Sequence, residues 1–322
     1  MAKRILVTGG AGFIGSHLVD ALVLAGHDVA VVDNLSTGTL HNLPDGPVFF
    51  QQDICDETGL RAVFEQFRPD VVCHQAAQMS VVRSVRDPAP DAQVNILGLL
   101  NVASASVATG VERLVFASSG GVLYGETPVP ADESAPLNPI CPYGLSKQAG
   151  ENYLRYYSRE FALPVVALRY ANVYGPRQNP KGEAGVVGIF STRLLRGETA
   201  TIHGDGSSVR DYIHVSDAVA ATIAAFESGT TGFETINIGT GIGASVNQLA
   251  HRIREACQTA LQQCRLPSDV PELQYAPFRP GELHSNLISC EKARSRLGWS
   301  ARTSLDVGIP QTVAWFADQL FC

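Results

Sequence analysis

The chain of 322 residues is 45% hydrophobic and 17% charged, which is typical of a globular protein with one large or two modest domains. Its net charge of -7 comes from acids and bases mixed along the sequence, so nucleic acid is not an expected partner. Seven cysteines without a C-x-x-C pair, no signal-peptide core and no long apolar run predict a cytoplasmic protein with reduced thiols, no metal site and no membrane span.

Short apolar runs alternate with helix-like segments through the first half of the chain. The predicted strands are RILVTG, DVAVVD, PVFFQQDI, DVVCHQA and RLVFASS, and the first intervening helix is expected over residues 15–25. This alternation predicts a parallel sheet with crossover helices, and near-continuous apolar runs suit strands that are covered on both faces. The predicted fold class is therefore α/β, with a doubly wound parallel sheet of the Rossmann type.

The second half predicts a smaller, discontinuous C-terminal lobe. After the strand-like PVVALRYA, the chain loosens into NVYGPRQNPKGEAGVVG, a stretch typical of a long functional loop, and TINIGT then resembles a strand again. We expect residues 1–171 to form the dinucleotide-binding domain, rejoined by about 211–240, with 172–210 and 241–322 in the substrate-binding lobe. Ser245 is expected to cap the helix SVNQLAHRIREA, and a last helix is expected through VGIPQTVAWFADQL.

A glycine-rich turn directly follows the first predicted strand. Gly10, Gly12 and Gly15 have the G-x-G-x-x-G spacing, which permits a tight turn and close approach of backbone N–H groups to a pyrophosphate. Asp33 ends the second strand, where a carboxylate can accept hydrogen bonds from ribose hydroxyls and would repel the 2′-phosphate of NADP. The combination predicts NAD binding. Asp53, which ends the third strand, could reach the adenine or could instead cap the following helix.

A possible proton-transfer pair lies at the predicted start of a later helix. Tyr143 and Lys147 have Y-x-x-x-K spacing, which places them one turn apart on one face. A free Tyr titrates near pH ~10, but a neighbouring cation favours the phenolate, which could abstract a hydroxyl proton. The spacing alone also fits a surface Tyr–Lys pair, but its place after a dinucleotide signature favours the functional interpretation. Upstream, SSGG follows a strand at its carboxyl end, where ligands bind in open α/β sheets.

Sequence blocks along almost the whole chain resemble those of one enzyme family. TGGAGFIG, DNLSTG, HQAAQ, SSGG-x-x-YG, PYGLSK, RYANVYGPRQ, GEAGVV, GDGSSVRDYIHV and RPGE are similar to blocks of the extended short-chain dehydrogenases/reductases, in particular UDP-glucose (UDP-galactose) 4-epimerases. The resemblance implies NAD-dependent 4-epimerisation of a UDP-hexose through a transient 4-keto sugar. It also implies a homodimer, in which the helix after Tyr143 and an expected helix over residues 89–109 build a four-helix contact.

The resemblance also implies which residues hold each ligand. The NAD site would be lined by Gly9, Gly12, Phe13, Ile14, Asp33, Asn34, Ser36, Gly38, Asp53, Ile54, Ala76, Ala77, Gln78, Asn95, Ser118, Tyr143, Lys147 and Tyr170. The uridine diphosphate would be held by Asn172, Val187, Arg210, Arg279 and Glu282. The two arginines lie in polar segments, where a guanidinium fork suits diphosphate oxygens, although a loop-bracing ion pair is the alternative for each.

The implied mechanism uses a tyrosine, a lysine and a serine. Tyr143 would take the 4-hydroxyl proton, Lys147 would hold Tyr143 ionised and bind the nicotinamide ribose, and Ser119 would steady the proton. The serine assignment departs from the family pattern, because counting back from the following YG places Gly120 at its position. The sheet fixes strand ends whereas a Gly-Gly turn absorbs an insertion, so we predict Ser119, with Ser118 as the alternative.

Several related functions remain open alternatives. The 4,6-dehydratases acting on nucleotide-linked glucose carry Asp-Glu after the catalytic hydroxyl, and Gly120 and Gly121 stand there in this chain. UDP-glucuronate epimerisation would need one further cationic contact. By resemblance Asn286 is a small wall residue, which predicts modest tolerance of N-acetylhexosamines. A non-catalytic NAD-binding regulator is a hypothesis of another class, and the complete Ser-Tyr-Lys set argues against it. We interpret Cys141 as an inert loop thiol and His214 as structural.

Overall fold

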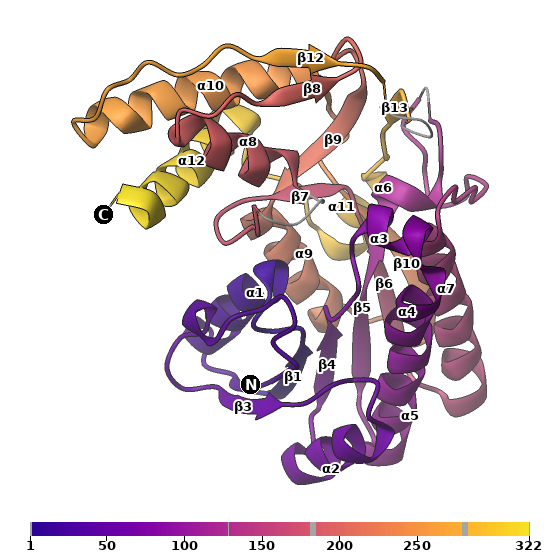
Figure 1. The fold of residues 1–322 in the computed structure, drawn as a ribbon. Coiled ribbons are helices and arrows are strands. Elements are labelled where there is room, and N and C mark those ends of the chain that lie inside the picture. The colour runs from indigo at the N-terminus through magenta and orange to yellow at the C-terminus, as the bar shows by residue number, and fades with distance from the viewer. Residues whose placement is uncertain (1, 128, 181–184, 279–282, 322) are drawn as a thin grey trace.

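The computed structural model describes residues 2–127, 129–180, 185–278 and 283–321. A seven-stranded sheet with the order β10-β6-β5-β4-β1-β2-β3 forms its centre, and all neighbouring strands are parallel (Figure 1). The strands are β1 Arg4–Thr8, β2 Asp28–Asp33, β3 Val48–Gln51, β4 Val71–His74, β5 Arg113–Ser119, β6 Val165–Tyr170 and β10 Phe233–Ile238. The predicted doubly wound sheet is confirmed. Its strand order reverses between β1 and β4, where such sheets bind ligands.

Helices cover both faces of this sheet, and for that reason its inner strands are buried and largely apolar. Every residue of β4 and β6 is buried. One face carries α2 Glu57–Phe67, α5 Leu99–Thr109 and α7 Pro142–Phe161, and the other carries α1 Phe13–Leu24, α9 Val215–Glu227 and α11 Glu291–Leu297. A cluster of buried apolar side chains fills the space beneath each helix layer.

An almost continuous helical segment connects β4 to β5. It comprises α3 Val81–Arg86, α4 Pro88–Ala92, the π-helix η2 Gln93–Gly98 and then α5. Two further short helices are the 3-10 turn η1 Leu40–Asn42 and α6 Gly120–Leu123. By length and composition the helix from Pro88 to Thr109 could cross a membrane, a property it shares with core helices of soluble proteins. Here it packs against α2 and α7.

The smaller lobe lies at one end of the sheet (Figure 1). Its strands are β7 Asn172–Tyr174, β8 Thr201–His203, β9 Val209–His214, β11 Gly243–Ser245, β12 Gln274–Ala276 and β13 Ser285–Asn286. β9 pairs with β7, β11 and β13, and β8 pairs with β12. The helices α8 Val186–Leu195, α10 Val246–Gln263 and α12 Leu305–Phe321 enclose a third apolar cluster. Ser245 caps α10 as predicted, in a reciprocal capping box with Gln248.

Two segments lie outside the lobes that the predicted boundaries gave them. The chain was expected to rejoin the large domain by about 211–240; β9 pairs within the smaller sheet, and the chain returns with α9 and then with β10, which contains the predicted strand TINIGT. α11 was expected in the smaller lobe, but it contacts β10 and α9. The reason is burial: Ala293 and Trp299 join the core beneath α9, and the Trp299 indole donates to Asp217 O at 3.1 Å.

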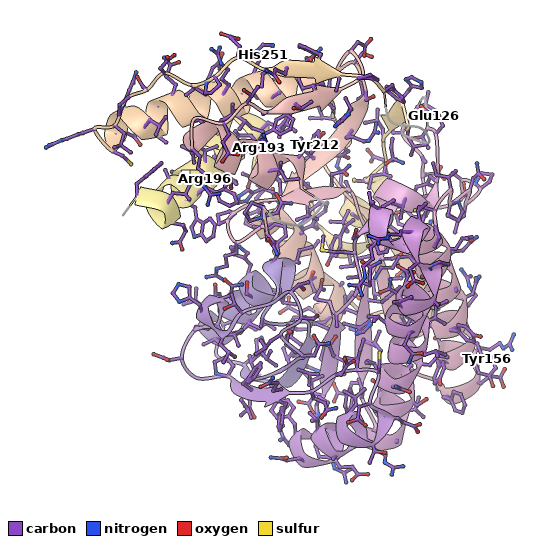
Figure 2. The ribbon with its side chains drawn as sticks, in the orientation of Figure 1. Glu126, Tyr156, Arg193, Arg196, Tyr212 and His251 are labelled. Carbon is purple, nitrogen blue, oxygen red and sulfur yellow. The ribbon has the colours of Figure 1, made fainter. Side chains whose placement is uncertain are left out.

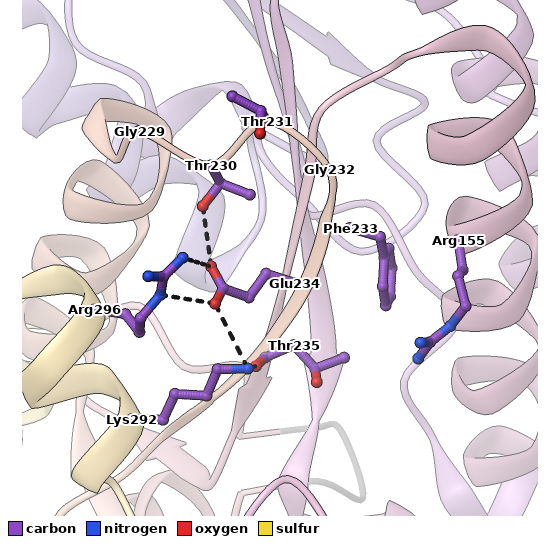
Figure 3. A pocket seen from close by; sticks show the side chains of 10 residues that line it. All are labelled: Arg155, Gly229, Thr230, Thr231, Gly232, Phe233, Glu234, Thr235, Lys292 and Arg296. Carbon is purple, nitrogen blue, oxygen red and sulfur yellow. Dashed lines mark hydrogen bonds and ion pairs between the residues drawn. The ribbon is translucent and has the colours of Figure 1, made fainter.

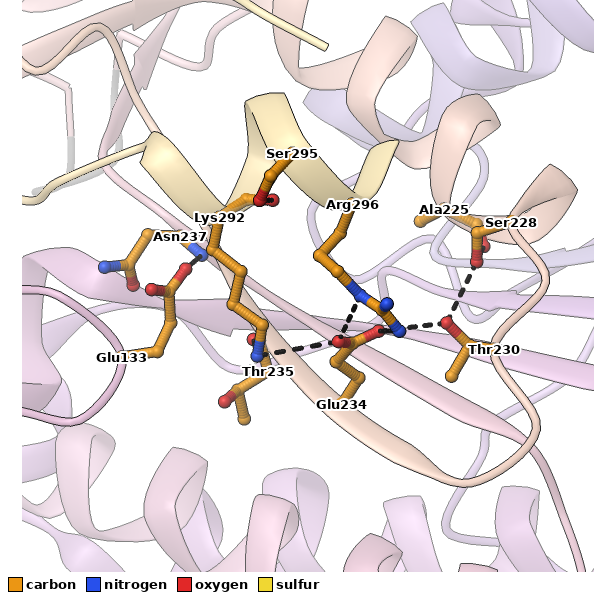
Figure 4. A network of polar contacts seen from close by, with 10 residues as sticks. All are labelled: Glu133, Ala225, Ser228, Thr230, Glu234, Thr235, Asn237, Lys292, Ser295 and Arg296. Carbon is orange, nitrogen blue, oxygen red and sulfur yellow. Dashed lines mark hydrogen bonds and ion pairs between the residues drawn. The ribbon is translucent and has the colours of Figure 1, made fainter. Parts of the chain in front are cut away.

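An ion-pair network closes the outer edge of the sheet at β10 (Figures 3 and 4). The Glu234 carboxylate, with 14% of its side chain exposed, lies 2.9 Å from Arg296 Nε and 3.7 Å from Lys292 Nζ. Lys292 also donates to the Thr235 carbonyl of the same strand at 2.7 Å. On the other side of the strand, Arg155 stacks over the Phe233 ring. Charges and a covering helix protect this edge from pairing with other chains, so we interpret the shallow pocket here as structural.

Candidate active site

A cleft of about 1900 Å³ lies between the carboxyl ends of the strands and the smaller lobe. The glycine-rich turn, the ends of β2, β4, β5 and β6, and the start of α7 line it from the large domain. Residues of α8, β8 and β9 line it from the smaller lobe. The cleft exceeds the ~300–1,000 Å³ of ordinary small-molecule pockets, which fits two extended ligands lying side by side.

The glycine-rich turn forms a cradle into which no side chain would fit. Gly9 has a φ of 69°, and a Cβ there would lie 2.6 Å from the Ala76 backbone nitrogen. A Cβ on Gly15 would overlap the Gly9 carbonyl oxygen. α1 starts directly afterwards with Gly12 at its N-cap, without a side-chain cap, so its first N–H groups can donate to a ligand. These features fit the pyrophosphate of NAD.

Asp33 is held in place at the end of β2. Its side chain is buried, and its two oxygens accept hydrogen bonds from the Ala11 amide at 3.0 Å and the Leu35 amide at 2.8 Å. The carboxylate thus fastens the glycine-rich turn to the loop after β2 while lining the cleft. Each carboxylate oxygen can accept more than one hydrogen bond, so capacity remains for ribose hydroxyls.

Asp53 also lines the cleft, and the alternative role considered for it does not apply. The helix that follows is capped by Asp56, whose carboxylate accepts from the Gly59 amide at 3.1 Å. Asp53 instead accepts from the Asn34 side chain at 2.8 Å and from the Cys55 amide at 2.8 Å. It therefore braces the loop beside the adenosine end of the cleft.

The residues predicted to bind NAD line the cleft, apart from Gly38 and Asn95. A Cβ on Gly38 would lie 2.8 Å from the Ala11 carbonyl carbon, so this glycine lets its loop pack behind the turn. Asn95 is buried, and its amide accepts from Gln78 N at 2.9 Å and donates to Gln78 O at 2.8 Å. Both residues thus support the wall of the cleft, and their direct contact with the cofactor stays a prediction.

Tyr143 and Lys147 lie in the first turns of α7, facing the cleft. Pro142 occupies the first helical position, where its missing N–H costs nothing, and the Tyr143 amide donates to Ser84 Oγ at 3.2 Å. Lys147 Nζ donates to the Ala117 carbonyl at 2.8 Å and lies 5.7 Å from the centre of the Tyr143 ring. The predicted pair is therefore brought together by the helix.

Burial has the largest influence on the electrostatics of the pair. Burial raises the pKa of Tyr143 above its ordinary value, the Asp91 and Cys141 charges add to this, and a hydrogen bond with Ser119 opposes it. Burial lowers the pKa of Lys147 to about 8, against the attraction of the Asp91 and Glu151 carboxylates. Desolvation is the largest influence on both pKa values, because both groups lie deep in the cleft, and the expected stabilisation of the Tyr143 phenolate by Lys147 stays a prediction.

The two candidate serines point in different directions. β5 ends at Ser119, which lines the cleft together with Tyr143 and is close enough to lower the pKa of the Tyr143 phenol. The Ser118 hydroxyl instead donates to a Glu151 carboxylate oxygen at 2.6 Å, behind the wall of the cleft. A Cβ on Gly120 would lie only 3.0 Å from the Ile288 side chain, so this tight turn has no room for a larger residue without movement. The geometry therefore presents Ser119 to Tyr143.

Three of the predicted diphosphate-binding residues line the cleft from its other side. They are Asn172, Val187 and Arg210, whereas Arg279 and Glu282 lie outside the described residues. The Arg210 guanidinium donates to the Val209 carbonyl at 2.9 Å and to the Leu283 carbonyl at 2.5 Å. Within the described part of the chain no carboxylate forms an ion pair with it, so its charge is available to an anionic ligand.

Sequence reasoning missed several residues that line the cleft. Phe190 and Arg193 of α8 follow the predicted Val187 at helical spacing, and this periodicity in VVGIFSTRLL was the signal that could have identified them. Tyr212 of β9 also lines the cleft, and Figure 2 places it in the smaller lobe with Arg193. Among the described residues no cluster of His, Cys, Asp and Glu is arranged to hold a metal ion.

The structure contradicts the interpretation of Asn286 and agrees with that of His214. Asn286 does not line the cleft: its side chain is buried and donates to the Gly125 carbonyl at 3.0 Å. The expectation that it forms a wall beside the sugar is therefore wrong. His214 is structural, as interpreted, since it caps α9 through the Ser216 amide and packs its ring against Tyr174.

Comparison with known proteins shows which family has a similar sequence and structure. The model of the NAD dependent epimerase/dehydratase family matches residues 5–239. UDP-glucose 4-epimerase of Mycolicibacterium smegmatis is 43% identical, over 98% of this chain and 99% of that protein. Two crystal structures are also similar: Thermotoga maritima UDP-glucose 4-epimerase with UDP-glucose (46% identity, TM-score 0.92, 98% and 99% coverage) and the Thermus thermophilus enzyme with NAD (45%, 0.90, 97% and 98%).

The match spans both lobes and includes the cradle, the acidic strand end and the Tyr–Lys helix described above. Identity above 40% over nearly the whole chain leaves no other fold family to consider. The chain therefore belongs to the NAD-dependent epimerase/dehydratase family, within the extended short-chain dehydrogenases/reductases.

Proposed function

We propose that this chain is an isomerase that interconverts UDP-glucose and UDP-galactose by NAD-dependent 4-epimerisation through a transient 4-keto sugar. The observation that carries the proposal is the Tyr143–Lys147 pair beside Ser119, in a cleft that is lined by the glycine-rich cradle of the large domain and by Arg210 of the smaller lobe. The similar enzymes of Mycolicibacterium smegmatis and Thermotoga maritima support it.

In the proposed mechanism Tyr143 and Lys147 act as one proton-transfer unit. The Tyr143 phenolate takes the proton of the sugar 4-hydroxyl, and the Lys147 ammonium offsets the cost of a buried negative charge. Ser119 donates its hydrogen bond to the oxygen that carries the charge. When bound, NAD supplies the acceptor and then the donor of the C4 hydrogen with its electron pair. Arg210 holds the diphosphate while the 4-keto sugar turns, and Tyr143 returns the proton with no net oxidation.

The site favours epimerisation over dehydration. Elimination of water needs an acid beside the catalytic hydroxyl, and this chain has Gly120 and Gly121 there. A Cβ on Gly121 would lie 3.8 Å from Ser119 Oγ, so a side chain at that position would approach the reacting centre. A second candidate substrate is UDP-glucuronate, because Arg83 and Arg86 of α3 line the cleft and could meet its carboxylate. UDP-N-acetylhexosamines stay a further alternative.

A substrate panel without added NAD tests the proposed function. We expect UDP-galactose to be converted to an equilibrium mixture with UDP-glucose, because a redox-neutral reaction regenerates a cofactor that stays bound. UDP-glucuronate, UDP-N-acetylglucosamine and dTDP-glucose are the comparison substrates, with products identified by mass spectrometry. A 4-keto-6-deoxy product from dTDP-glucose would contradict the proposal. Absence of turnover on every substrate, by protein that retains NAD, would favour the regulator hypothesis.

We also propose that the chain forms a homodimer through α7 and its neighbour α5. Leu145, Tyr153 and Tyr156 are exposed and follow one another at helical spacing on α7, and Leu97 of η2 is exposed beside α5. Tyr156 lies on the outer side of α7 in Figure 2. An unpartnered apolar stripe of this kind is typical of a two-fold helix interface.

The Tyr153→Glu variant is expected to be monomeric, whereas the wild-type protein elutes as a dimer in size-exclusion chromatography with light scattering. A buried unpaired carboxylate at each side of the contact accounts for the expected dissociation. The matched control is Leu24→Glu, which introduces the same charge at a 90% exposed position on α1 and should leave the dimer intact. An equal mass for both variants would contradict the proposed interface.

A cytoplasmic location is part of the same proposal. The cysteines that the structure describes are all free thiols, Cys55, Cys73, Cys141, Cys257, Cys264 and Cys290. Free thiols suit a reducing compartment, in which UDP-sugars are also a reasonable substrate pool.

A further inference from the structure

A buried carboxylate that has no role in the proposed mechanism lies against α7, the helix that carries Tyr143 and Lys147. Asp91 of α4 is 1% exposed. One of its oxygens accepts from Gln78 Nε2 at 2.8 Å and Asn95 Nδ2 at 3.0 Å, and the other accepts from the Ser146 hydroxyl. Ser146 lies on α7 between Tyr143 and Lys147. The described residues include no Lys or Arg in an ion pair with Asp91, so its charge acts on its surroundings through space.

The other charges around the Tyr143–Lys147 pair are neutralised or exposed. The titratable and charged groups on the elements around the pair are His74 of β4, Arg83 and Arg86 of α3, Asp87 and Asp91 beside or on α4, Cys141 before α7, Glu151 of α7 and Arg169 of β6. Burial lowers the pKa of His74 to about 3, which leaves it neutral. Arg169 pairs with Glu151 at 2.6 Å, and Arg83, Arg86 and Asp87 are exposed. Asp91 is therefore the buried anion without a cation of its own.

We propose that Asp91 is a positioning residue for the reaction: it fixes the first turns of α7 through Ser146, and its negative charge retains a proton on the Tyr143–Lys147 pair. The contact with Gln78 extends the same anchor to the wall of the cofactor cleft, since Gln78 lines the cleft and Asp91 does not. This inference deepens the proposed function and rests on it for the role of the pair.

The sign of the expected effect follows from the charge of Asp91. A nearby anion favours the protonated form of both the phenol and the amine, and it acts in this direction on Tyr143 and on Lys147. The active state of the pair has lost one proton and kept one, so the rate rises through the first ionisation of the pair and falls through the second. Removing the anion therefore moves both limbs of the pH–rate profile to lower pH.

The Asp91→Asn variant tests this with little change of shape. The amide oxygen can still accept from Gln78 and Asn95, and its NH₂ group can donate to Ser146 Oγ. We expect both limbs of the kcat profile to move to lower pH by roughly one unit. The tyrosinate absorbance of Tyr143, taken as the difference from the Tyr143→Phe protein in each background, should also appear at lower pH. The proposal is overturned if both limbs of the kcat profile and the tyrosinate titration of this variant stay at their wild-type pH.

Two controls separate charge from contact. Ser146→Ala breaks the hydrogen bond but keeps the carboxylate, so it should lower kcat and leave both limbs in place. Asp306→Asn removes the same charge from an exposed carboxylate, which pairs with Arg252, and should leave the profile unchanged. If Asp91→Asn does not fold by circular dichroism, Asp91→Ser provides the uncharged variant and the same criterion applies. Because the tyrosinate titration needs no turnover, it tests Asp91 even if no UDP-sugar is epimerised.

Discussion

A Tyr143→Phe variant is expected to epimerise UDP-galactose about 10³-fold more slowly than the wild-type enzyme, with a nearly unchanged KM. Among the described residues, the Tyr143 phenol is the group in the cleft that has both Ser119 and Lys147 beside it. Lys147 cannot replace it as the base, because its ammonium is directed to the Ala117 carbonyl at 2.8 Å. Loss of one oxygen removes the proton acceptor and leaves the binding surface in place, so kcat should change and KM should not.

The matched control is Tyr153→Phe, the same change on the same helix at a position that does not line the cleft. It should retain wild-type kcat. Bound NAD, measured by absorbance after its release from denatured protein, should be equal in the three proteins, which separates lost chemistry from a lost cofactor. A kcat within tenfold of wild type for Tyr143→Phe would contradict the assigned base.

Removing the Arg169 guanidinium is expected to lower the free energy of unfolding by about 3–5 kcal/mol. Arg169 and Glu151 form a bidentate pair, with N–O distances of 2.9 and 2.6 Å and side chains that are 4% and 2% exposed. Arg169 also donates to the Tyr124 hydroxyl at 2.7 Å. The Arg169→Met variant would leave the Glu151 carboxylate buried without its cation, and this uncompensated charge is the main source of the loss.

Urea denaturation followed by circular dichroism measures this loss. A double variant, Arg169→Met with Glu151→Met, should recover most of the stability, because a buried ion pair and an apolar pair of similar volume are often nearly equivalent. Arg159→Met removes an arginine from an exposed pair with Glu160 and should cost less than about 1 kcal/mol. A similarly small loss for Arg169→Met would mean that water or another group solvates Glu151.

The features that the sequence predicts well are those encoded by neighbouring residues. The strands of the large sheet follow from their apolar runs, and the glycine-rich turn and the Ser245 cap follow from local geometry. The Tyr143–Lys147 pair follows from the helical repeat, because one turn of α7 carries both side chains. These predictions need no knowledge of which distant segments meet.

The features that the sequence does not predict depend on contacts between distant segments of the chain. Nothing in the sequence around Asp91 indicates that Ser146 will lie against it, since the contact forms only when α4 packs on α7. Counting from a family motif placed Asn286 at the cleft, but its side chain is buried and donates to the Gly125 carbonyl, a contact between segments far apart in the sequence. The desolvation that controls the Tyr143 pKa likewise arises from the assembled cleft.

The position of β10 has a consequence for how this chain reaches its native state. β6 pairs with β5 on one side and with β10 on the other, and the smaller lobe begins between β6 and β10 in the sequence. During synthesis one edge of β6 therefore stays unpaired until β10 has left the ribosome. Late, non-local pairing of this kind slows folding and exposes an edge to aggregation. We therefore expect fragments that end after β6 to aggregate, and the two lobes to become stable together.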